Sequence, residues 1–460
     1  MEDEPPITHL TSPPTELTDS ERLALDKLEK VIATSAYHDS QAHSTLLGCL
    51  PGTRKEQIER IMEWSEMPDS DNRKPFFIVL GPAGSGKSSL LWTIAQVCKS
   101  KGSYAASFFF SSTNPERNNS ARLVNTIVYQ FTEAIPQLRP YVARALEAEP
   151  SILSRSMRVQ LDTLLLRPLS EFQSDHPIFA GCFHHCVVVI DALDECGDDK
   201  VQLQVIEALT AALSSPSFPL LCILSSRFDV HIENAFSCEP AQPLVHARLA
   251  LGQGEAAEKQ DIFTYLNKST MNIRNNHPFR PRIPRDWPNE SDLELIVERS
   301  GGQFIYAATV IRYIESPLHK PHERLQHILN LPNSRPGTNP FIVLDDLYRA
   351  LMLSAEKRET VMEILGIELV SSSPHFWTPV TLRFSNFFEN HFKSLDADMV
   401  LAPLASVLRY EDREVTFYHL SFAEFLLEST RSKEFFVEPM KWQKWMISHL
   451  VQRFYEDKGT

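Results

Sequence analysis

The sequence lacks the features of a membrane or secreted protein. No apolar run approaches the length of about 20 residues that is needed to cross a bilayer. The chain opens with acidic residues and prolines, not with a secretory signal. Cysteine is scarce, with seven in 460 residues and no framework spacing, which argues against a disulfide scaffold. We therefore expect no membrane span and a cytoplasmic location.

Positive charge is also in short supply. The chain has 45 Lys and Arg against 59 Asp and Glu, a formal net charge of −14. This balance argues against broad binding to nucleic acid or to anionic membranes. The segment Cys182-Phe-His-His-Cys186 contains zinc-ligand residue types. It has no second half at a suitable spacing and leads into an apolar strand, so we expect a structural role for it.

A glycine-rich motif at residues 81–88 carries the clearest chemical signal. It follows an apolar run at 76–80 that predicts a buried strand, and it precedes a segment with a helical pattern. The motif fits G-x-x-x-x-G-K-[ST], which predicts a phosphate-binding loop. Lys87 is expected to reach the β- and γ-phosphates, and Ser88 to place its hydroxyl on Mg²⁺. The nucleotide-binding residues are predicted to be Gly81, Pro82, Ala83, Gly84, Ser85, Gly86, Lys87, Ser88 and Ser89.

A second apolar run, at residues 185–191, ends in an acidic turn. Asp191 closes the run and is expected to hold Mg²⁺ together with Ser88. Asp194 and Glu195 follow, and one of them is expected to orient or deprotonate an attacking water. The alternative is a strand that ends in a solvated acidic turn.

A third strand end carries Ser225-Ser-Arg227. An arginine at this place can sense the γ-phosphate and stabilise its developing charge, so Arg227 is a candidate catalytic residue. The alternative is an ordinary surface ion pair. Ligands of open parallel sheets bind at the carboxyl ends of the strands, so Lys87, Asp191 and Arg227 are expected to converge.

Strands alternating with helices predict an α/β fold, with a parallel sheet covered by helices on both faces. Four strands are expected, at 76–80, 105–110, 185–191 and 218–226. From about residue 255 the pattern is helical, and a short strand at 415–418 beside helices suggests a winged-helix-like module. The expected divisions are a disordered acidic terminus with a short amphipathic helix (1–36), a helical linker (37–75), a nucleotide-binding domain (76–240), a helical domain (241–335), a winged-helix-like domain (336–432) and a terminal helix (433–460).

Together, these motifs resemble the NACHT branch of the STAND P-loop NTPases, most closely its fungal members. The resemblance covers roughly residues 37–430 and includes Cys49–Arg54, the Asp-Ala-Leu-Asp-Glu block at 191–195 and Gly302-Gln-Phe-Ile-Tyr-Ala307. It implies a switch that is closed with ADP, opens and oligomerises with ATP, and hydrolyses ATP slowly, ATP being a more expected substrate than GTP. Mg²⁺ is the implied metal, and the implied setting is intracellular signalling or non-self recognition with an unknown protein partner.

The block Tyr418-His-Leu-Ser-Phe-Ala-Glu-Phe425 resembles the winged-helix block of NACHT-type receptors. This resemblance implies that His419 donates to the β-phosphate of ADP and locks the closed form. The alternative is a histidine that packs between Phe417 and Phe422.

The fungal relatives usually carry repeats after this region and an effector domain before it, which the 460 residues do not show. A second class of function is therefore a nucleotide-stabilised scaffold or regulatory partner with little hydrolysis.

Overall fold

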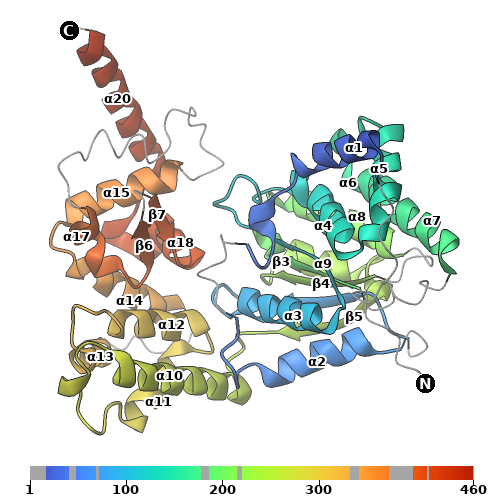
Figure 1. Cartoon of the computed structure of the whole chain (residues 1–460). Coiled ribbons are helices and arrows are strands. Elements are labelled where there is room, and N and C mark those ends of the chain that lie inside the picture. Colours follow the sequence, from blue (N-terminus) through green and yellow to red (C-terminus); the bar gives the residue numbers. More distant parts are fainter. Residues whose placement is uncertain are drawn as a thin grey trace. The chain divides into compact units, whose positions relative to one another are not determined.

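The computed structural model describes residues 17–40, 48–68, 72–177, 186–214, 220–331, 341–371, 397–411 and 414–458 (Figure 1). The chain forms two compact units, which we describe separately. The first consists of residues 1–82 and 87–251, and the second of residues 83–86 and 252–460. The expected disorder of residues 1–16, most of the zinc-like motif and the boundary expected at 335/336 lie outside the described residues.

The first unit is built on a parallel sheet of five strands in the order β2-β3-β4-β1-β5. The strands are β1 (Phe76–Leu80), β2 (Tyr104–Phe109), β3 (Val187–Asp191), β4 (Leu221–Ser226) and β5 (Val245–Ala250). The first four confirm the strands expected from the apolar runs. β5 was not expected, because its sequence Val-His-Ala-Arg-Leu-Ala mixes polar with apolar residues, as an edge strand can. With β5 paired to β1, the first unit extends to Leu251 and not to residue 240.

Helices cover both faces of this sheet, as expected (Figure 1). Successive side chains of a strand point to opposite faces. Phe76, Ile78 and Leu80 accordingly join one apolar core, while Phe77 and Val79 join the other. The helices on the first face are α1 (Asp19–Glu29), α4 (Leu123–Ala134), α5 (Arg139–Ala148), α6 (Met157–Leu161), α7 (Arg167–Asp175), α8 (Asp199–Leu213) and α9 (Val230–Ser237), and those on the second are α2 (Lys55–Glu66) and α3 (Lys87–Lys101).

The segments before β1 belong to the first unit. α1 begins with a capping box, in which the Thr18 hydroxyl accepts from the Glu21 amide and the Glu21 carboxylate accepts from the Thr18 amide. Leu28 of α1 is fully buried in the core of the first face. Trp64 of α2 is buried under the sheet, and its indole N–H donates to the Lys74 carbonyl at 2.9 Å. Residues 48–68 therefore pack onto the sheet and do not form a separate linker.

The second unit is mostly helical around one apolar core. Its helices are α10 (Ala256–Asn276), α11 (Glu290–Ser300), α12 (Phe304–Ile314), α13 (Pro321–Leu329), α14 (Phe341–Ser354), α15 (Arg358–Ser371), α17 (Ala397–Leu401), α18 (Leu420–Leu427), α19 (Ser429–Ser432) and α20 (Pro439–Lys458). The antiparallel strands β6 (Leu408–Glu411) and β7 (Glu414–Phe417) precede α18. This hairpin beside helices agrees with the expected small strand. Over the described residues, no helix is long and apolar enough to span a membrane.

Candidate nucleotide-binding site

The glycine-rich motif forms a tight turn between β1 and α3. Gly84 and Gly86 have φ angles of +79° and +90°, a region that side chains with a Cβ rarely adopt. By their contacts, Ala83–Gly86 group with the second unit, in which the Ile305 amide donates to the Gly84 carbonyl at 3.1 Å. A Cβ on Gly84 would lie 2.1 Å from Cγ2 of Ile305. Both the backbone angle and this close approach therefore require glycine at position 84.

Lys87 is the buried cation at the start of α3. Its side chain is largely enclosed, and Nζ donates to the carbonyls of Gly81 at 2.6 Å and Pro82 at 3.1 Å. Burial lowers the pKa of Lys87, while the nearby Asp194 and Asp191 carboxylates act in the opposite direction. The lysine thus brings a positive charge to the turn that the sequence predicts to hold phosphate.

Asp191 lies at the carboxyl end of β3 and is almost fully buried. Ser225 of β4 donates its hydroxyl to Oδ1 at 2.5 Å, and the Ser88 hydroxyl also bonds to this carboxylate. Burial raises the pKa of Asp191, and both serine hydrogen bonds oppose that rise. Mg²⁺ prefers oxygen ligands and is usually bound through one or two carboxylates together with substrate phosphates and waters. The Ser88 hydroxyl and the Asp191 carboxylate fit that requirement.

The backbone turns sharply after Asp191. Ala192 has a φ of 56°, which is uncommon for a residue other than glycine. Its amide donates to the Ser225 hydroxyl at 2.9 Å, so one serine holds both Asp191 and the residue that follows it. The turn continues through a short 3₁₀ helix, Leu193–Glu195, which presents the acidic pair.

Glu195 is held by the loop that follows β2. The Ser112 amide donates to Oε2 of Glu195 at 3.0 Å, and the Gly197 amide donates to the Asn118 carbonyl at 2.9 Å. Burial, helped by the neighbouring Asp194, raises the pKa of Glu195 to about 7. A carboxylate with a pKa near the working pH is suited to accept a proton.

Asp194 has a different environment from Glu195. Its Oδ2 lies 2.9 Å from Nε of Arg227, and its Oδ1 accepts from the Arg227 amide at 3.1 Å. The exposed fractions of the two side chains are 7% for Asp194 and 29% for Arg227. The sequence analysis gave a surface ion pair as the alternative role of Arg227. An ion pair is present, but it is largely buried and so is not an ordinary surface pair. Because Asp194 is occupied by this arginine, Glu195 is the better candidate for activating water.

Three supporting residues had no role assigned from the sequence. Ser225 orients Asp191, Ser112 orients Glu195, and Arg117 lies in the same loop as Ser112. Nη1 of Arg117 donates to the Phe109 carbonyl at 3.2 Å. Burial lowers the pKa of Arg117, while Glu195 and Asp191 raise it. Ser225 belongs to the Ser-Ser-Arg block, so the sequence contained a signal for this residue. No motif spacing in the sequence pointed to Ser112 or Arg117.

His419 lies in the second unit, where it is the N-cap residue of α18. Its Nδ1 accepts from the Ser421 amide at 3.0 Å and lies 2.8 Å from the Ser421 hydroxyl. The rings of Phe417 and Phe422 contact each other at 6.0 Å between centroids. His419 therefore caps a helix, a role that neither of the two sequence interpretations included. Its contact with a nucleotide remains a prediction.

The first unit thus brings most of the predicted residues to one edge of its sheet. Lys87, Ser88, Asp191 and Arg227 follow the carboxyl ends of β1, β3 and β4, which are neighbours in the order β3-β4-β1. Ser89 lies in the first turn of α3. This is the convergence that the sequence predicted for these ends.

Two comparisons of sequence describe what the chain is similar to. Residues 55–227 match the profile of the family described as Nephrocystin 3, N-terminal. The vegetative incompatibility protein HET-E-1 of Podospora anserina is 23% identical over 380 residues, which are 81% of this chain and 26% of that protein. The chain thus spans about a quarter of the length of that relative.

The solved structures share a smaller fraction of identical residues with this chain than HET-E-1 does. The Walker-type ATPase of Pyrococcus abyssi is 14% identical with a TM-score of 0.39, covering 82% of this chain and 97% of that one. The ORC2 protein of Aeropyrum pernix, in ADPNP–ADP complexes, is 11% identical with a TM-score of 0.32, covering 97% and 98%.

The family match contains both the phosphate loop and the acidic strand end, and the incompatibility protein extends the similarity over most of the chain. These findings support the assignment of this chain to the NACHT-type STAND NTPases.

Proposed function

We propose that this protein is a nucleotide-dependent molecular switch of the NACHT class, closed with ADP and self-associating with ATP, and that it hydrolyses ATP slowly. The observation that carries the proposal is the meeting of Lys87, Ser88, Asp191 and Glu195 at one sheet edge. Such a set binds phosphate, holds Mg²⁺ and activates water. Intracellular signalling or non-self recognition, with an unidentified protein partner, is the setting we propose from the resemblance.

Each residue has a defined task in this proposal. Lys87 and the amides of the phosphate loop hold the phosphates. Ser88 and Asp191 hold Mg²⁺, which supplies charge neutralisation at the phosphates. Glu195 accepts the proton of the attacking water, and Arg227 senses the γ-phosphate after leaving Asp194. A preference for ATP over GTP and a cytoplasmic location belong to the same proposal.

Replacing Arg227 with alanine is expected to weaken ATP binding more than ADP binding, by about tenfold, because a charge-assisted contact with the γ-phosphate is lost. The substitution also leaves Asp194 buried without its ion-pair partner, which destabilises a protein. The double variant D194N/R227A removes both charges and is the matched control. Calorimetry with both nucleotides is the measurement. An equal loss of affinity for ATP and ADP, relieved in the double variant, would reduce Arg227 to a structural role.

Replacing His419 with leucine is expected to weaken ADP retention and to enlarge the assembled fraction in light scattering. A ligand shifts an equilibrium only by its differential affinity for the two states, so loss of an ADP contact made in the closed state favours the open one. Leucine also removes the N-cap of α18, at a cost of about 1 kcal/mol. His419→Ser keeps a capping oxygen and removes the imidazole, so it separates the two effects.

Both His419 variants should release ADP faster than the native protein if the imidazole contacts the nucleotide. An effect confined to the leucine variant would assign His419 to capping alone.

The scaffold alternative predicts a different result. It expects tight nucleotide binding and ATP-independent assembly, with no phosphate release above background.

A further inference from the structure

The loop that joins α10 to α11 concentrates positive charge on a chain whose net charge is −14. Residues 274–287 contain four arginines and one aspartate, with no lysine or glutamate. Like charges held close together repel one another unless an acidic group lies nearby. Arg274 begins this stretch, and three further arginines, which we call the loop arginines, are all exposed: Arg280, Arg282 and Arg285.

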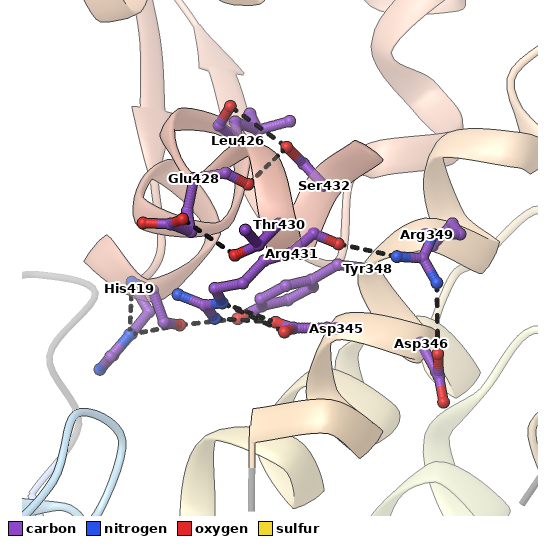
Figure 2. Close-up of polar contacts among 11 residues, drawn as sticks. Asp345, Asp346, Tyr348, Arg349, His419, Leu426, Glu428, Thr430, Arg431 and Ser432 are labelled. Carbon is purple, nitrogen blue, oxygen red and sulfur yellow. Dashed lines mark hydrogen bonds and ion pairs between the residues drawn. The ribbon is translucent and has the colours of Figure 1, made fainter. Parts of the chain in front are cut away.

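The loop arginines have no acidic partner in the part of the chain that the structure describes, where none of them forms an ion pair with a carboxylate. Two other arginines of the second unit are paired. Figure 2 shows Arg431 in a two-pronged ion pair with Asp345, with Nη2–Oδ1 at 2.7 Å and Nε–Oδ2 at 3.1 Å. Nη1 of Arg349 lies 3.4 Å from Oδ1 of Asp346. The loop arginines therefore differ from these in keeping an uncompensated charge.

The backbone of this loop is held in place at both ends. Nη1 of Arg274 donates to the Trp287 carbonyl at 3.3 Å. The buried His277 uses both ring nitrogens, since Nε2 donates to the Ser316 carbonyl at 3.1 Å and Nδ1 accepts from the Phe279 amide at 3.1 Å. A loop fixed in this way loses little conformational freedom when it binds a partner.

Two of the loop arginines are also oriented, and in both cases by a neutral group. Nη1 of Arg280 donates to the Asn275 carbonyl at 3.3 Å. The Arg282 guanidinium lies 5.9 Å from the centre of the Phe279 ring, a distance at which a cation is attracted to an aromatic face. Neither contact cancels the positive charge. A guanidinium is a planar fork that can donate two parallel hydrogen bonds to a carboxylate, so the loop is suited to bind acidic side chains.

Exposed apolar side chains lie beside the basic loop. The bond between His277 and Ser316 joins the loop to the segment after α12, and Leu318 of that segment is 72% exposed. Met271 is 55% exposed and lies one helical turn before Arg274 on α10. Protein interfaces are enriched in arginine and methionine, whereas interfaces with nucleic acid are more polar and more uniformly basic. The combination therefore favours a protein partner.

The size of the basic loop limits what can bind to it. Residues 280–285 span at most about 20 Å, the length of about six residues of extended chain. DNA and anionic membranes present a much wider field of negative charge, which the net charge of −14 on this chain would repel. A short acidic segment of polypeptide needs to meet only the loop itself.

We propose that residues 274–287, together with Met271 and Leu318, form a docking surface for a short acidic peptide segment of a protein partner. Carboxylates of the segment bind the loop arginines, and an apolar side chain of the segment packs against the exposed apolar residues. The proposal gives a chemistry to the unidentified partner of the proposed function. The surface itself does not rest on that function, because none of its residues belongs to the nucleotide motifs.

The test selects binders for the full-length protein, without added nucleotide, from a phage-displayed library of random peptides. Peptides enriched on the native protein should contain several Asp or Glu residues beside an apolar residue. One such peptide is then labelled, and its affinity is measured by fluorescence polarisation. The triple variant R280Q/R282Q/R285Q should bind it about tenfold more weakly or worse, as expected for lost charge-assisted hydrogen bonds. The substituted side chains are exposed, and a thermal melt checks that the variant folds.

A second form of the peptide, with Asn and Gln in place of Asp and Glu, tests whether the carboxylates meet the loop arginines. It should bind the native protein about as weakly as the acidic peptide binds the triple variant. It should show little further loss with the triple variant, because the same contacts are already gone.

The matched control is R155Q/R158Q/R167Q, which makes the same change at three exposed arginines of the first unit. Two of these have acidic partners, Arg155 with Glu149 and Arg167 with Asp162. This control should bind the acidic peptide like the native protein.

Leu318→Ser tests the apolar part of the surface without changing its charge. It should weaken binding of the acidic peptide by about threefold or more, because an apolar side chain that is covered on binding is lost. An affinity equal to that of the native protein would overturn the inclusion of Leu318 in the surface.

Two results would overturn the docking surface as a whole. The first is an acidic peptide that binds the native protein and R280Q/R282Q/R285Q with equal affinity. The second is a selection without acidic peptides, combined with binding of a labelled single-stranded RNA or of phosphatidylserine vesicles that the triple variant loses. That second result would assign the loop to a polyanion and not to a protein partner.

Discussion

Lys87→Ala should abolish measurable binding of both ATP and ADP, with a loss of affinity of about 100-fold or more. Lys87 is the long cation of the phosphate loop, and charge-assisted contacts with phosphate are about twice as strong as neutral ones. Its side chain is largely buried beside Asp191 and Asp194, so no mobile surface lysine is expected to replace it. Isothermal calorimetry with each nucleotide is the measurement.

The structure defines the controls for this experiment. Lys87 Nζ also donates to the Gly81 and Pro82 carbonyls, so alanine removes two bonds within the loop itself. Lys87→Met keeps the aliphatic stem and removes only the charged donor. Lys99→Ala, on the same helix, removes a lysine whose partner is the half-exposed Asp39 at 2.7 Å. ATP affinity that is unchanged in both Lys87 variants would refute the phosphate-loop assignment.

The strands that the sequence predicted correctly are those buried on both faces. β1 is apolar throughout, while β3 and β4 are apolar runs that end in Asp191 and in Ser225 and Ser226. Every residue of the three strands is buried, and such runs stand out without an alignment. β5 was missed because three of its six residues are only partly buried and two are exposed, so its sequence did not need to be apolar. The sequence placed the end of the nucleotide-binding domain at residue 240, before β5, for the same reason: β5 was not recognised as a strand.

The site was predictable wherever chemistry requires a particular residue at a strand end. Lys87, Ser88, Asp191 and Arg227 lie at the strand ends where their motif spacings predicted them, and their roles at a nucleotide stay predictions. Their partners were not predictable. The Ser112–Glu195 bond joins residues far apart in sequence, and a loop of ordinary composition brings them together. The division of labour between Asp194 and Glu195 likewise depends on Arg227, and only the fold reveals that pairing.

The capping role of His419 was missed for a related reason. Serine, threonine, aspartate and asparagine are the usual N-cap residues, and histidine is not among them. In this chain Nδ1 of the imidazole does what a side-chain oxygen normally does. The cap uses Nδ1 of the ring, and the contact of His419 with a nucleotide stays a prediction.

Glu195→Gln should leave ATP binding intact and slow phosphate release by about 100-fold or more, the range for a general base. The amide of glutamine cannot accept the proton of the attacking water, yet it can still accept the Ser112 hydrogen bond that orients Glu195. Glu207→Gln is the matched control, because Glu207 is exposed on α8 and undergoes the same chemical change. Phosphate release is measured with ATP binding checked on each variant.

The pH dependence of turnover gives an independent reading of the same residue. A carboxyl group must be ionised to accept a proton, and burial raises the pKa of Glu195 to about 7. The ionised fraction falls as the pH drops through that value, so native turnover should decline from pH 8 towards pH 6, and the residual rate of Glu195→Gln should be flat over this range. Asp194→Asn distinguishes the neighbouring carboxylate. If Asp194→Asn loses the acid-side decline while Glu195→Gln keeps it together with native turnover, the base is Asp194, and Arg227 must leave it before each hydrolytic event.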